Sequence, residues 1–381
     1  MRICIIANGY PTKSDPQRGC FEKDQALALL HAGHEVSILY VDRRRLKYGQ
    51  KFWTTHTTKE GIEVFGICCP LPFLYRISYK WYYKVGTLLL DRVFKYMLRF
   101  VPKPDIIHAH FLFNIADAVS LKKKYNIPLV GTEHWSKLNE RLLPDEVHYQ
   151  ANIAYNNTDC LLAVSDSLKQ LILSHFGKEA IVLHNMIGEE FLGIQRKEKI
   201  NGSKIEIVAT GSLIYRKGFD VLIKALSRAN SKMPDWRLRI IGEGIERDSL
   251  QQMIDSYNLG DKIYLIGRHT KNEIIDIYSE SDFFVLPSRA ENFSVAILEA
   301  LAAGLPVVGT LCGGIKECIN ESNGLIVPVD DIDGLANSIM EIATNLHKYD
   351  HDSIADNCRQ NFSPSVIVHD LTTYYESVFN K

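Results

Sequence analysis

The stretch RICIIANGYPTKSDPQRGCFEKDQALALLHAGHEVSILYV, residues 2–41, contains two short apolar runs, RICIIA and HEVSILYV. The loop after the first run, NGYPTKSDPQRG, is rich in the Gly, Pro and polar residues that form turns. The next segment, CFEKDQALALLHAG, has helical spacing and ends at Gly33, a residue favoured at helix C-termini. Strand, loop, helix and strand in this order make the βαβ unit of a parallel sheet. The stretch therefore predicts an α/β fold.

The same pattern recurs along the chain. A second copy consists of DIIHAHF, NIADAVSLKKKYN and PLVGTEH, and a third of DCLLAVS, DSLKQLILSHFG and AIVLHN. After the polar stretch 188–204 the pattern restarts with IEIVATG and KGFDVLIKALSRAN, and it continues to GLIVPV. A length of 381 residues suits two domains. We therefore predict two doubly wound α/β halves joined by a linker at 188–204, with the active site at the carboxyl ends of the strands.

Composition and charge narrow the class of protein. The chain is 46% hydrophobic and 23% charged, which is typical of a globular protein. Residues 1–185 carry 24 Lys and Arg against 17 Asp and Glu, whereas residues 186–381 carry 20 against 28. The basic first half suits an anionic partner, such as a membrane surface or a phosphorylated acceptor. Nucleic acid is not expected as a partner, because no nucleic-acid-binding module is recognisable.

The cysteines and the N-terminal segment indicate the cellular compartment of the protein. The eight cysteines include no C-x-x-C pair, which argues against a zinc site and favours buried free thiols. The N-terminal apolar run is too short for a signal peptide, and no run reaches the ~20 apolar residues of a membrane span. We therefore expect a cytoplasmic protein.

Two segments of the second half carry the chemistry. RAENFSVAILEALAAGLPVVG, residues 289–309, contains Glu291 and Glu299. Glu299 lies in an apolar helical run, where a charge is costly unless a partner hydrogen-bonds to it. GSLIYRKGFD follows a strand and opens a helix, so Arg216 and Lys217 lie near a helix N-terminus, which favours anions. A phosphate or diphosphate is the natural ligand of such a site.

In their order and spacing these segments resemble the retaining nucleotide-sugar glycosyltransferases of the GT-B fold, specifically family 4. In that family the segment like 289–309 carries an E-x7-E signature, complete here as Glu291 to Glu299. The resemblance implies that Glu299 binds the ribose hydroxyls of the nucleotide, since an ionised carboxylate accepts two hydroxyl hydrogen bonds. It implies that the donor sugar is held by Glu291 and by the backbone amides of Asn292, Phe293 and Ser294.

Arg216 and Lys217 resemble the diphosphate clamp of the family. Many members read Gly-Arg-Leu at the start of this loop, whereas this sequence reads Gly-Ser-Leu at 211–213, so its arginine is placed differently. Glycine-rich turns complete the predicted donor site with Gly211, Gly242 and Glu243.

The first half resembles the family less closely. RGCFEKDQALALLHAGHEVSILY is similar to the first loop and helix, where Gly19 lets the chain approach the acceptor side. DIIHAHF and GTEHW each bring a histidine to a strand end, and His110 and His134 match positions that contact the donor sugar or the acceptor. A histidine at a strand end is also commonly structural. The predicted catalytic residues are Glu291, Lys217, Arg216, His110 and His134.

The resemblance also implies an architecture and an activity. The expected fold is GT-B, with two Rossmann-like domains facing a central cleft. The expected domains are an acceptor-side domain at 1–187, a nucleotide-sugar-binding domain at 188–360, and a helix at 361–381 that crosses back to the first domain. The expected reaction moves a sugar from a UDP- or GDP-sugar to a hydroxyl of a glycan or lipid-linked acceptor, with retention, in surface polysaccharide synthesis.

No metal or other cofactor is expected, because cations and helix N-termini meet the charge of the diphosphate. The D-x-D sequence at 331–333 is interpreted as a helix cap. Two alternatives stay open, a non-catalytic nucleotide-sugar-binding subunit and a UDP-sugar 2-epimerase of the same fold. An NAD-dependent dehydrogenase is excluded because no G-x-G-x-x-G follows the first strand.

Residues 75–104, where the resemblance is weakest, carry a separate prediction. Read as a helix, they form an apolar stripe with spacings of three or four: Trp81, Val85, Leu89, Val93, Met97 and Phe100. A basic stripe lies beside it: Lys80, Lys84, Arg92, Lys95, Arg99 and Lys103. One interpretation is a helix that packs on the first domain with a solvated basic edge. The other is a helix that makes peripheral contact with an anionic membrane, which would suit a lipid-linked acceptor.

Overall fold

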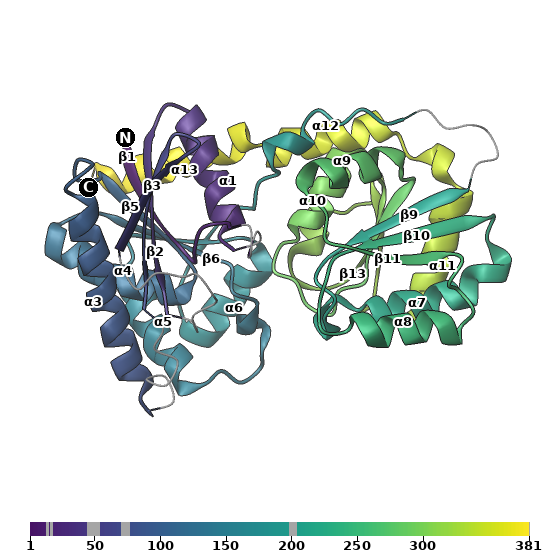
Figure 1. Ribbon diagram of the computed structural model, residues 1–381, viewed down its shortest axis with the longest axis horizontal. Helices are drawn as coiled ribbons and strands as arrows, with labels where there is room; N and C mark the ends of the chain where they lie inside the picture. The colour runs from purple at the N-terminus through teal and green to yellow at the C-terminus, as the bar shows by residue number, and fades with distance from the viewer. Residues whose placement is uncertain (13–14, 16–17, 44–53, 70–76, 198–203, 381) are drawn as a thin grey trace. The chain divides into compact units, whose positions relative to one another are not determined.

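The computed structural model describes residues 1–381 apart from 13–14, 16–17, 44–53, 70–76, 198–203 and 381 (Figure 1). The chain forms two compact units: Met1–Leu183 with Ile367–Lys381, here called unit 1, and His184–Val366, called unit 2. The chain enters unit 2 shortly before the predicted boundary at 187/188 and leaves it shortly after the one predicted at 360/361. Residues Ile367–Lys381 thus cluster with the beginning of the chain.

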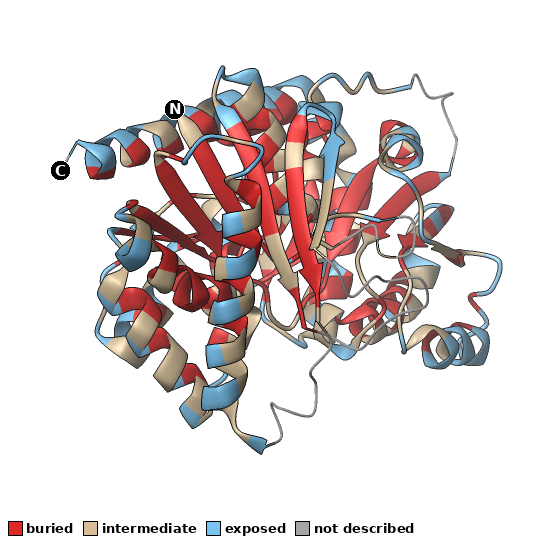
Figure 2. Cartoon of the chain, turned by 60° about the vertical axis from the view of Figure 1, so that its left-hand side comes forward, coloured by how far each residue is buried: buried red, intermediate tan, exposed pale blue. Residues whose placement is uncertain are grey.

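Unit 1 is built on a sheet whose described strands follow the order β3-β4-β2-β1-β5-β6-β7-β8. Their bounds are β1 Arg2–Ala7, β2 Glu35–Asp42, β3 Thr54–Lys59, β4 Ile62–Cys68, β5 Ile106–His110, β6 Leu129–Glu133, β7 Cys160–Ala163 and β8 Ile181–Val182. All neighbouring strands run parallel except the β3–β4 hairpin. The central strands β1, β5 and β6 are buried along nearly their whole length (Figure 2), as expected for a parallel sheet covered by helices on both faces.

The helices of unit 1 start and stop where local chemistry favours it. Their bounds are α1 Cys20–His31, α3 Tyr79–Met97, α4 Leu112–Tyr125, α5 Asp145–Asn157, α6 Asp166–Phe176 and α13 Pro364–Phe379. The hydroxyl of Ser165 accepts a hydrogen bond from the backbone N–H of Leu168 and caps α6, which ends at Gly177 with a φ of 63°. Within the described residues, no helix combines the length and the apolarity needed to cross a bilayer.

Unit 2 contains a parallel sheet whose described strands follow the order β11-β10-β9-β12-β13-β14. The strands are β9 Ile205–Thr210, β10 Trp236–Ile241, β11 Ile263–Gly267, β12 Phe283–Leu286, β13 Val307–Thr310 and β14 Gly324–Val327. The helices are α7 Phe219–Ala229, α8 Arg247–Ser256, α9 Lys271–Glu280, α10 Val295–Ala302, α11 Ile332–Thr344 and α12 His351–Phe362. The order reverses between β9 and β12, as in the doubly wound nucleotide-binding fold.

The core of unit 2 follows from helical periodicity. On α7, Phe219, Leu222 and Leu226 recur at spacings of three or four and are fully buried. On α11, Leu335 and Ile339 form a similar buried row. The two helices contact each other over one face of the sheet, and this packing fixes the start of α7, where the predicted phosphate-binding loop ends.

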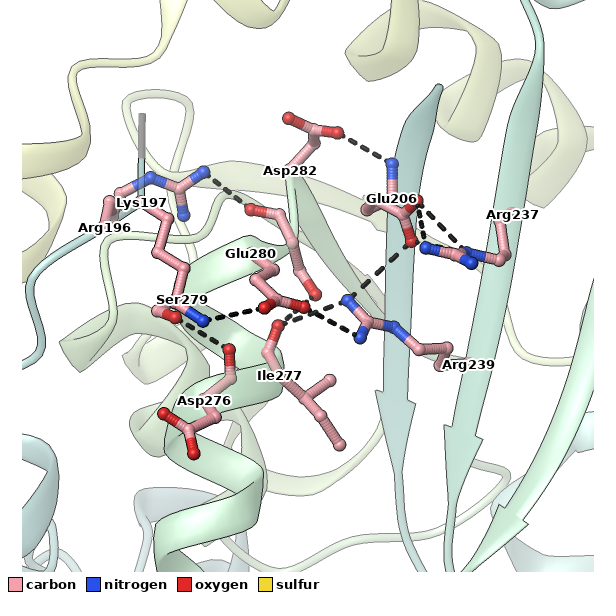
Figure 3. A network of polar contacts seen from close by, with 11 residues as sticks. Arg196, Lys197, Glu206, Arg237, Arg239, Asp276, Ile277, Ser279, Glu280 and Asp282 are labelled. Carbon is pink, nitrogen blue, oxygen red and sulfur yellow. Dashed lines mark hydrogen bonds and ion pairs between the residues drawn. The ribbon is translucent and has the colours of Figure 1, made fainter. Parts of the chain in front are cut away.

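The stretch before β9 is tied to unit 2 by a network of charged groups (Figure 3). The guanidinium of Arg196 donates to the carbonyl of Ser281 at 2.6 Å, and Lys197 Nζ lies 2.7 Å from Glu280. Glu280 also pairs with Arg239 of β10 at 3.2 Å. Part of the predicted linker 188–204 is therefore anchored on unit 2 rather than free of it.

Candidate functional site

The loop after β9 brings Lys217 to Glu291, which follows β12. Nζ of Lys217 lies 2.5 Å from Oε1 of Glu291, and the two side chains are only 14% and 9% exposed. β9 and β12 are the strands between which the sheet order reverses, which is the usual place for a ligand in such folds. The structure thus brings together two residues, 74 positions apart, that the sequence predicted for one site.

Gly218 allows the two loops to approach each other. Its φ is 69°, a left-handed conformation that favours glycine, and a Cβ atom there would lie 2.0 Å from the carbonyl oxygen of Pro287. α7 begins at the next residue, Phe219. The first turn of a helix carries unpaired N–H groups and a partial positive charge. A cation and a helix N-terminus, both suited to a phosphate, therefore lie side by side.

The Glu291 carboxylate is held by Ser288, which follows β12, and Ser288 is held in turn by residues at the end of β13. The Ser288 hydroxyl donates to Oε1 of Glu291 at 2.7 Å. The carbonyl of Ser288 accepts in turn from the hydroxyl of Thr310, the last residue of β13, and from Sγ of Cys312 at 3.3 Å. Ser288 and Thr310 are buried. These contacts fix the position and orientation of Glu291, and none of them was predicted from the sequence.

Arg289 binds the loop that carries Lys217 through several hydrogen bonds. Its guanidinium makes two hydrogen bonds to Asp220, at 2.8 and 2.9 Å, and one to the carbonyl of Tyr215 at 2.6 Å. It also pairs with Asp330 at 2.7 Å and lies 3.9 Å from the centre of the Tyr215 ring. The backbone N–H of Arg289 donates to the carbonyl of Arg216 at 2.7 Å. Arg289 was not among the residues predicted from the sequence, where its one signal was its position beside the E-x7-E segment.

The structure gives Arg216 a contact of its own. Its guanidinium donates to the carbonyl of Ala290 at 3.3 Å, so it bridges the same two loops as the Lys217–Glu291 pair. The cation that the sequence places at an unusual point of the loop therefore lies within the candidate site.

The glycine-rich turns after β9 and β10 are joined by backbone hydrogen bonds. The N–H of Gly211 donates to Ile241 at 2.9 Å, and that of Leu213 donates to Glu243 at 3.0 Å. A Cβ on Gly242 would lie 1.9 Å from the carbonyl oxygen of Gly211, so glycine is needed for this approach. The carboxylate of Glu243 pairs with Arg247 at 3.0 Å.

The residues after Glu291 form the entry to α10. Phe293 is buried between the rings of His184 and Phe362, with centroids 4.6 and 5.6 Å away. The carbonyl of Asn292 accepts from the N–H of Gly314 at 2.8 Å. Ser294 is the N-cap of α10, the first helical residue being Val295. The backbone at 292–294 is therefore held from both sides.

Glu299 lies half-buried on α10. Burial raises the pKa of Tyr278 well above its usual value, and the negative charge of Glu299 adds to the rise, so the two side chains are near each other. The Tyr278 hydroxyl donates to Oγ1 of Thr210, the last residue of β9, at 2.9 Å. Glu299 is therefore located toward the carboxyl end of the strand that leads to Lys217.

The predicted histidines of unit 1 form a stack with His108. Nδ1 of His110 lies 2.9 Å from Nε2 of His134, and the His108 and His110 rings are 4.3 Å apart. His108 is bound at both nitrogens, by Tyr375 of α13 and Thr132 of β6, each at 2.7 Å. Nε2 of His110 is buried and has no hydrogen-bond partner among the described residues. Burial holds all three imidazoles neutral, lowering the pKa of His108 to about 3 and that of His134 to about 4.

Gly19 lies in the loop after β1. Its φ is 68°, and a Cβ there would lie 2.2 Å from the carbonyl oxygen of Gly9. The neighbouring Arg18 donates to the carbonyl of Asn8 at 2.7 Å and pairs with Asp42 at the end of β2. Glycine is therefore required for the tight packing of this loop, and Gly19 lies at the carboxyl edge of the sheet. Gly19, His110 and His134 belong to unit 1, and the other predicted site residues belong to unit 2.

The described residues contain no cluster of three His, Cys, Asp or Glu side chains that could hold a metal ion. In the D-x-D sequence at 331–333, Asp331 accepts from the N–H of Gly334 at 2.8 Å and caps α11, as predicted, while Asp333 pairs with Arg228.

Comparison with known proteins gives the family. Two family models match adjacent parts of the chain, Glycosyltransferase Family 4 over residues 23–191 and Glycosyl transferases group 1 over residues 192–359. The chain is a group 1 glycosyltransferase of the GT-B fold. The family predicted from the E-x7-E segment is therefore confirmed.

This glycosyltransferase is 29% identical over 361 residues to a glycogen synthase of Mycobacterium tuberculosis, covering 90% of this chain and 86% of the relative. It is 24% identical over 389 residues to a putative colanic acid biosynthesis glycosyltransferase of Salmonella typhimurium, covering 93% and 92%. The solved structure of sucrose-phosphate synthase from Thermosynechococcus elongatus matches with a TM-score of 0.78 at 18% identity, covering 100% and 99%. The predicted pair of Rossmann-like domains of the GT-B type is confirmed.

Proposed function

We propose that this glycosyltransferase moves a sugar from a UDP- or GDP-sugar to a hydroxyl of a glycan or lipid-linked acceptor, with retention of configuration and without a metal ion. The observation that carries the proposal is the Lys217–Glu291 pair, 2.5 Å apart and nearly buried at the point where the strand order reverses. The relative in colanic acid synthesis supports a role in surface polysaccharide synthesis.

Departure of the nucleoside diphosphate places negative charge on the leaving oxygen. The ammonium of Lys217 has three N–H donors, so it can hold Glu291 and a phosphate oxygen at the same time. The first-turn N–H groups of α7 add to it, and one such donor is worth roughly 3–4 kcal/mol in comparable oxyanion sites. Fixed cationic and dipolar groups therefore supply the charge stabilisation that a metal ion supplies elsewhere.

The two carboxylates of the signature have separate roles in the proposal. Glu291 accepts hydrogen bonds from Ser288 and Lys217, which leaves lone pairs for a hydroxyl of the donor sugar. Glu299, toward the end of β9, accepts from the ribose hydroxyls. Because Glu291 is engaged by a cation and a hydroxyl, it is a poor nucleophile. The acceptor oxygen instead bonds to the anomeric carbon on the face that the diphosphate leaves, and its proton passes to a phosphate oxygen.

Unit 1 contributes the acceptor side and a contact to the sugar. His110 is held neutral by burial, so its Nε2 can exchange a hydrogen bond with a sugar hydroxyl without carrying charge. Gly19 keeps the β1 loop compact at the carboxyl edge of the same sheet. The alternatives are a non-catalytic nucleotide-sugar-binding subunit and a UDP-sugar 2-epimerase. The products formed from a nucleotide-sugar distinguish both from a transferase.

The test is incubation of the protein with UDP-, GDP- and ADP-sugars, followed by NMR of the products. Slow hydrolysis that releases the sugar with the anomeric configuration of the donor supports a retaining transferase. An epimerised sugar would identify the epimerase, and binding without turnover would identify the inactive subunit. A nucleotide at 100 times its Kd should stabilise the protein by about 2.7 kcal/mol, so a thermal-shift screen selects the base first.

A further inference from the structure

The outer face of α3 in unit 1 is rich in exposed cations and exposed apolar side chains. We define the α3 face as Lys80, Trp81, Lys84, Leu88, Arg92 and Lys95 of α3, together with Ile77 before the helix and Arg99 after it, all of which are exposed. At about 100° per residue the six of these positions that lie within α3, from Lys80 to Lys95, fall within a stripe roughly 120° wide. Trp81 is 60% exposed and Leu88 62% exposed, which is unusual for such large apolar groups on a helix that also has a buried face.

The inward face of α3 is distinct from this stripe. Leu90, Val93, Phe94 and Met97 are buried against unit 1. Gly86 is buried too, and a Cβ there would lie 1.9 Å from Nη1 of Arg43, so the glycine lets α3 lie against the Arg43–Asp117 pair. The helix is therefore fixed by its inner side, and packing within unit 1 does not use Trp81 and Leu88.

All charged side chains of the α3 face are basic. Asp91 is the one acidic residue of α3, and it is neutralised by Lys124 of α4 at 2.8 Å and by Lys95 at 3.0 Å. The ammonium of Lys84 lies 5.2 Å from the ring of Trp81, so cation and aromatic ring project together. A surface that combines several cations with exposed Trp and Leu complements a bilayer of anionic lipid. The apolar groups enter the headgroup region and the cations meet the lipid phosphates.

We propose that the α3 face docks on an anionic phospholipid bilayer. Its purpose rests on the proposed function, because docking would bring unit 1 to an acceptor that is anchored in lipid. The exposed apolar residues differ from the stripe predicted from the sequence. Val93 and Met97 of that stripe are buried, whereas Trp81 and Phe100 are exposed. Trp81 therefore joins the cations on the outer face.

The experiment is co-sedimentation of the full chain with vesicles of phosphatidylcholine alone or with added phosphatidylglycerol, at low and high salt. We expect binding to the anionic vesicles at low salt, with release at high salt. On binding, the fluorescence of Trp81 should shift to shorter wavelength, and this shift should be missing in Trp81→Ser. Wild-type protein that stays in the supernatant with anionic vesicles at low salt would overturn the proposal.

Two variants separate the charge and apolar contributions. Lys80→Gln, Lys84→Gln and Arg92→Gln together should weaken vesicle binding about a hundredfold, since each cation near such a surface contributes roughly fivefold. Its matched control replaces three exposed cations elsewhere, Arg141, Lys232 and Lys348, with Gln and should change binding little. If both triple variants lose affinity equally, the basic charge of the chain rather than the α3 face attracts the vesicles, and the proposal is wrong.

The apolar variant is Trp81→Ser with Leu88→Ser, which should weaken binding at least about tenfold. Its control is Leu142→Ser with Ile245→Ser, two side chains that are 85% and 92% exposed outside the α3 face. Equal loss in both pairs would count against docking through α3.

Nucleoside-diphosphate affinity is measured on every variant, because the donor residues lie in unit 2. Normal nucleotide binding without vesicle binding rejects docking and leaves the proposed function intact. Vesicle binding without nucleotide binding rejects the proposed function and leaves docking of the α3 face intact. Self-association of the wild type that the α3 variants abolish, in the absence of lipid, would show that the face binds a second copy instead.

Discussion

Arg289→Met should destabilise unit 2 and slow catalysis. The substitution removes a guanidinium that is 12% exposed, and it leaves Asp220 with Lys224, 3.3 Å away, as its other cation. The aliphatic chain of Met fills much of the space of the Arg stem, so loss of the polar contacts dominates the effect.

The magnitude follows from those contacts. A hydrogen bond to a charged group contributes about 1.5–3 kcal/mol, and Arg289 makes two to Asp220. The contact with Asp330 adds little, because that carboxylate is 50% exposed and screened by solvent. We therefore expect a loss of about 3–4 kcal/mol. For a domain of this size that is a decrease in Tm of roughly 6–16 °C. Since Arg289 also holds the loop that carries Lys217, kcat/KM should decrease about 10- to 100-fold.

The assay is thermal unfolding followed by circular dichroism, together with donor-hydrolysis kinetics. The control is Arg228→Met, which breaks an ion pair with Asp333 whose side chains are 52% and 76% exposed. That pair should contribute less than about 1 kcal/mol. If Arg289→Met unfolds within about 1 °C of the control and retains wild-type kcat/KM, the reasoning that Arg289 positions the loop is wrong.

Three further outcomes are expected. Glu299→Ala should weaken nucleoside-diphosphate binding at least about tenfold by calorimetry, whereas Glu291→Ala should lower kcat more than nucleotide affinity; unchanged affinity in Glu299→Ala contradicts the ribose assignment. Transfer or hydrolysis should survive EDTA, and loss of activity that Mg²⁺ restores would contradict metal independence. The pKa of His108 is about 3 in the folded protein against 6.5 as its ordinary value, so the stability it contributes above pH 6.5 is lost as the pH falls toward 3. At pH 5 this amounts to about 2 kcal/mol, so His108→Gln should flatten the dependence of Tm on pH while His347→Gln, at an exposed position, should not.

The fold was predictable because its signals are local. Each strand of unit 2 is a short apolar run that ends in a turn, and each helix has periodic apolar residues, so the alternation alone indicates a parallel sheet. Glu291 and Lys217 were predictable for another reason: a carboxylate signature and a basic helix start each combine residue types with a recognisable chemistry. That both belong to one donor site was expected from the family resemblance, whereas their direct ion pair was not predicted.

The supports of the site were not predictable in the same way. Arg289 acts on Asp220, 69 positions away, and Thr310 acts on Ser288, 22 positions away. Neither pair has a sequence signal, because each depends on which strand ends become neighbours in the sheet. The apolar stripe of α3 was only partly right for a related reason. Val93 and Met97 of that stripe are buried, as in a helix packed on the first domain, whereas Trp81 and Phe100 are exposed, because spacing alone does not say which side of a helix faces the sheet.

The route of the chain through its two units has a consequence for biosynthesis. Unit 2 is inserted between β8 and the part of α13 that begins at Ile367, and Tyr375 of α13 is fully buried and hydrogen-bonded to Nδ1 of His108. A nascent chain therefore has all of unit 2 before it has the last helix of unit 1. Until that helix emerges, the imidazole of His108 lacks its tyrosine partner, and Leu371 and Tyr375, which are buried in the finished protein, are not yet packed. Unit 1 is therefore completed only after unit 2 has been synthesised.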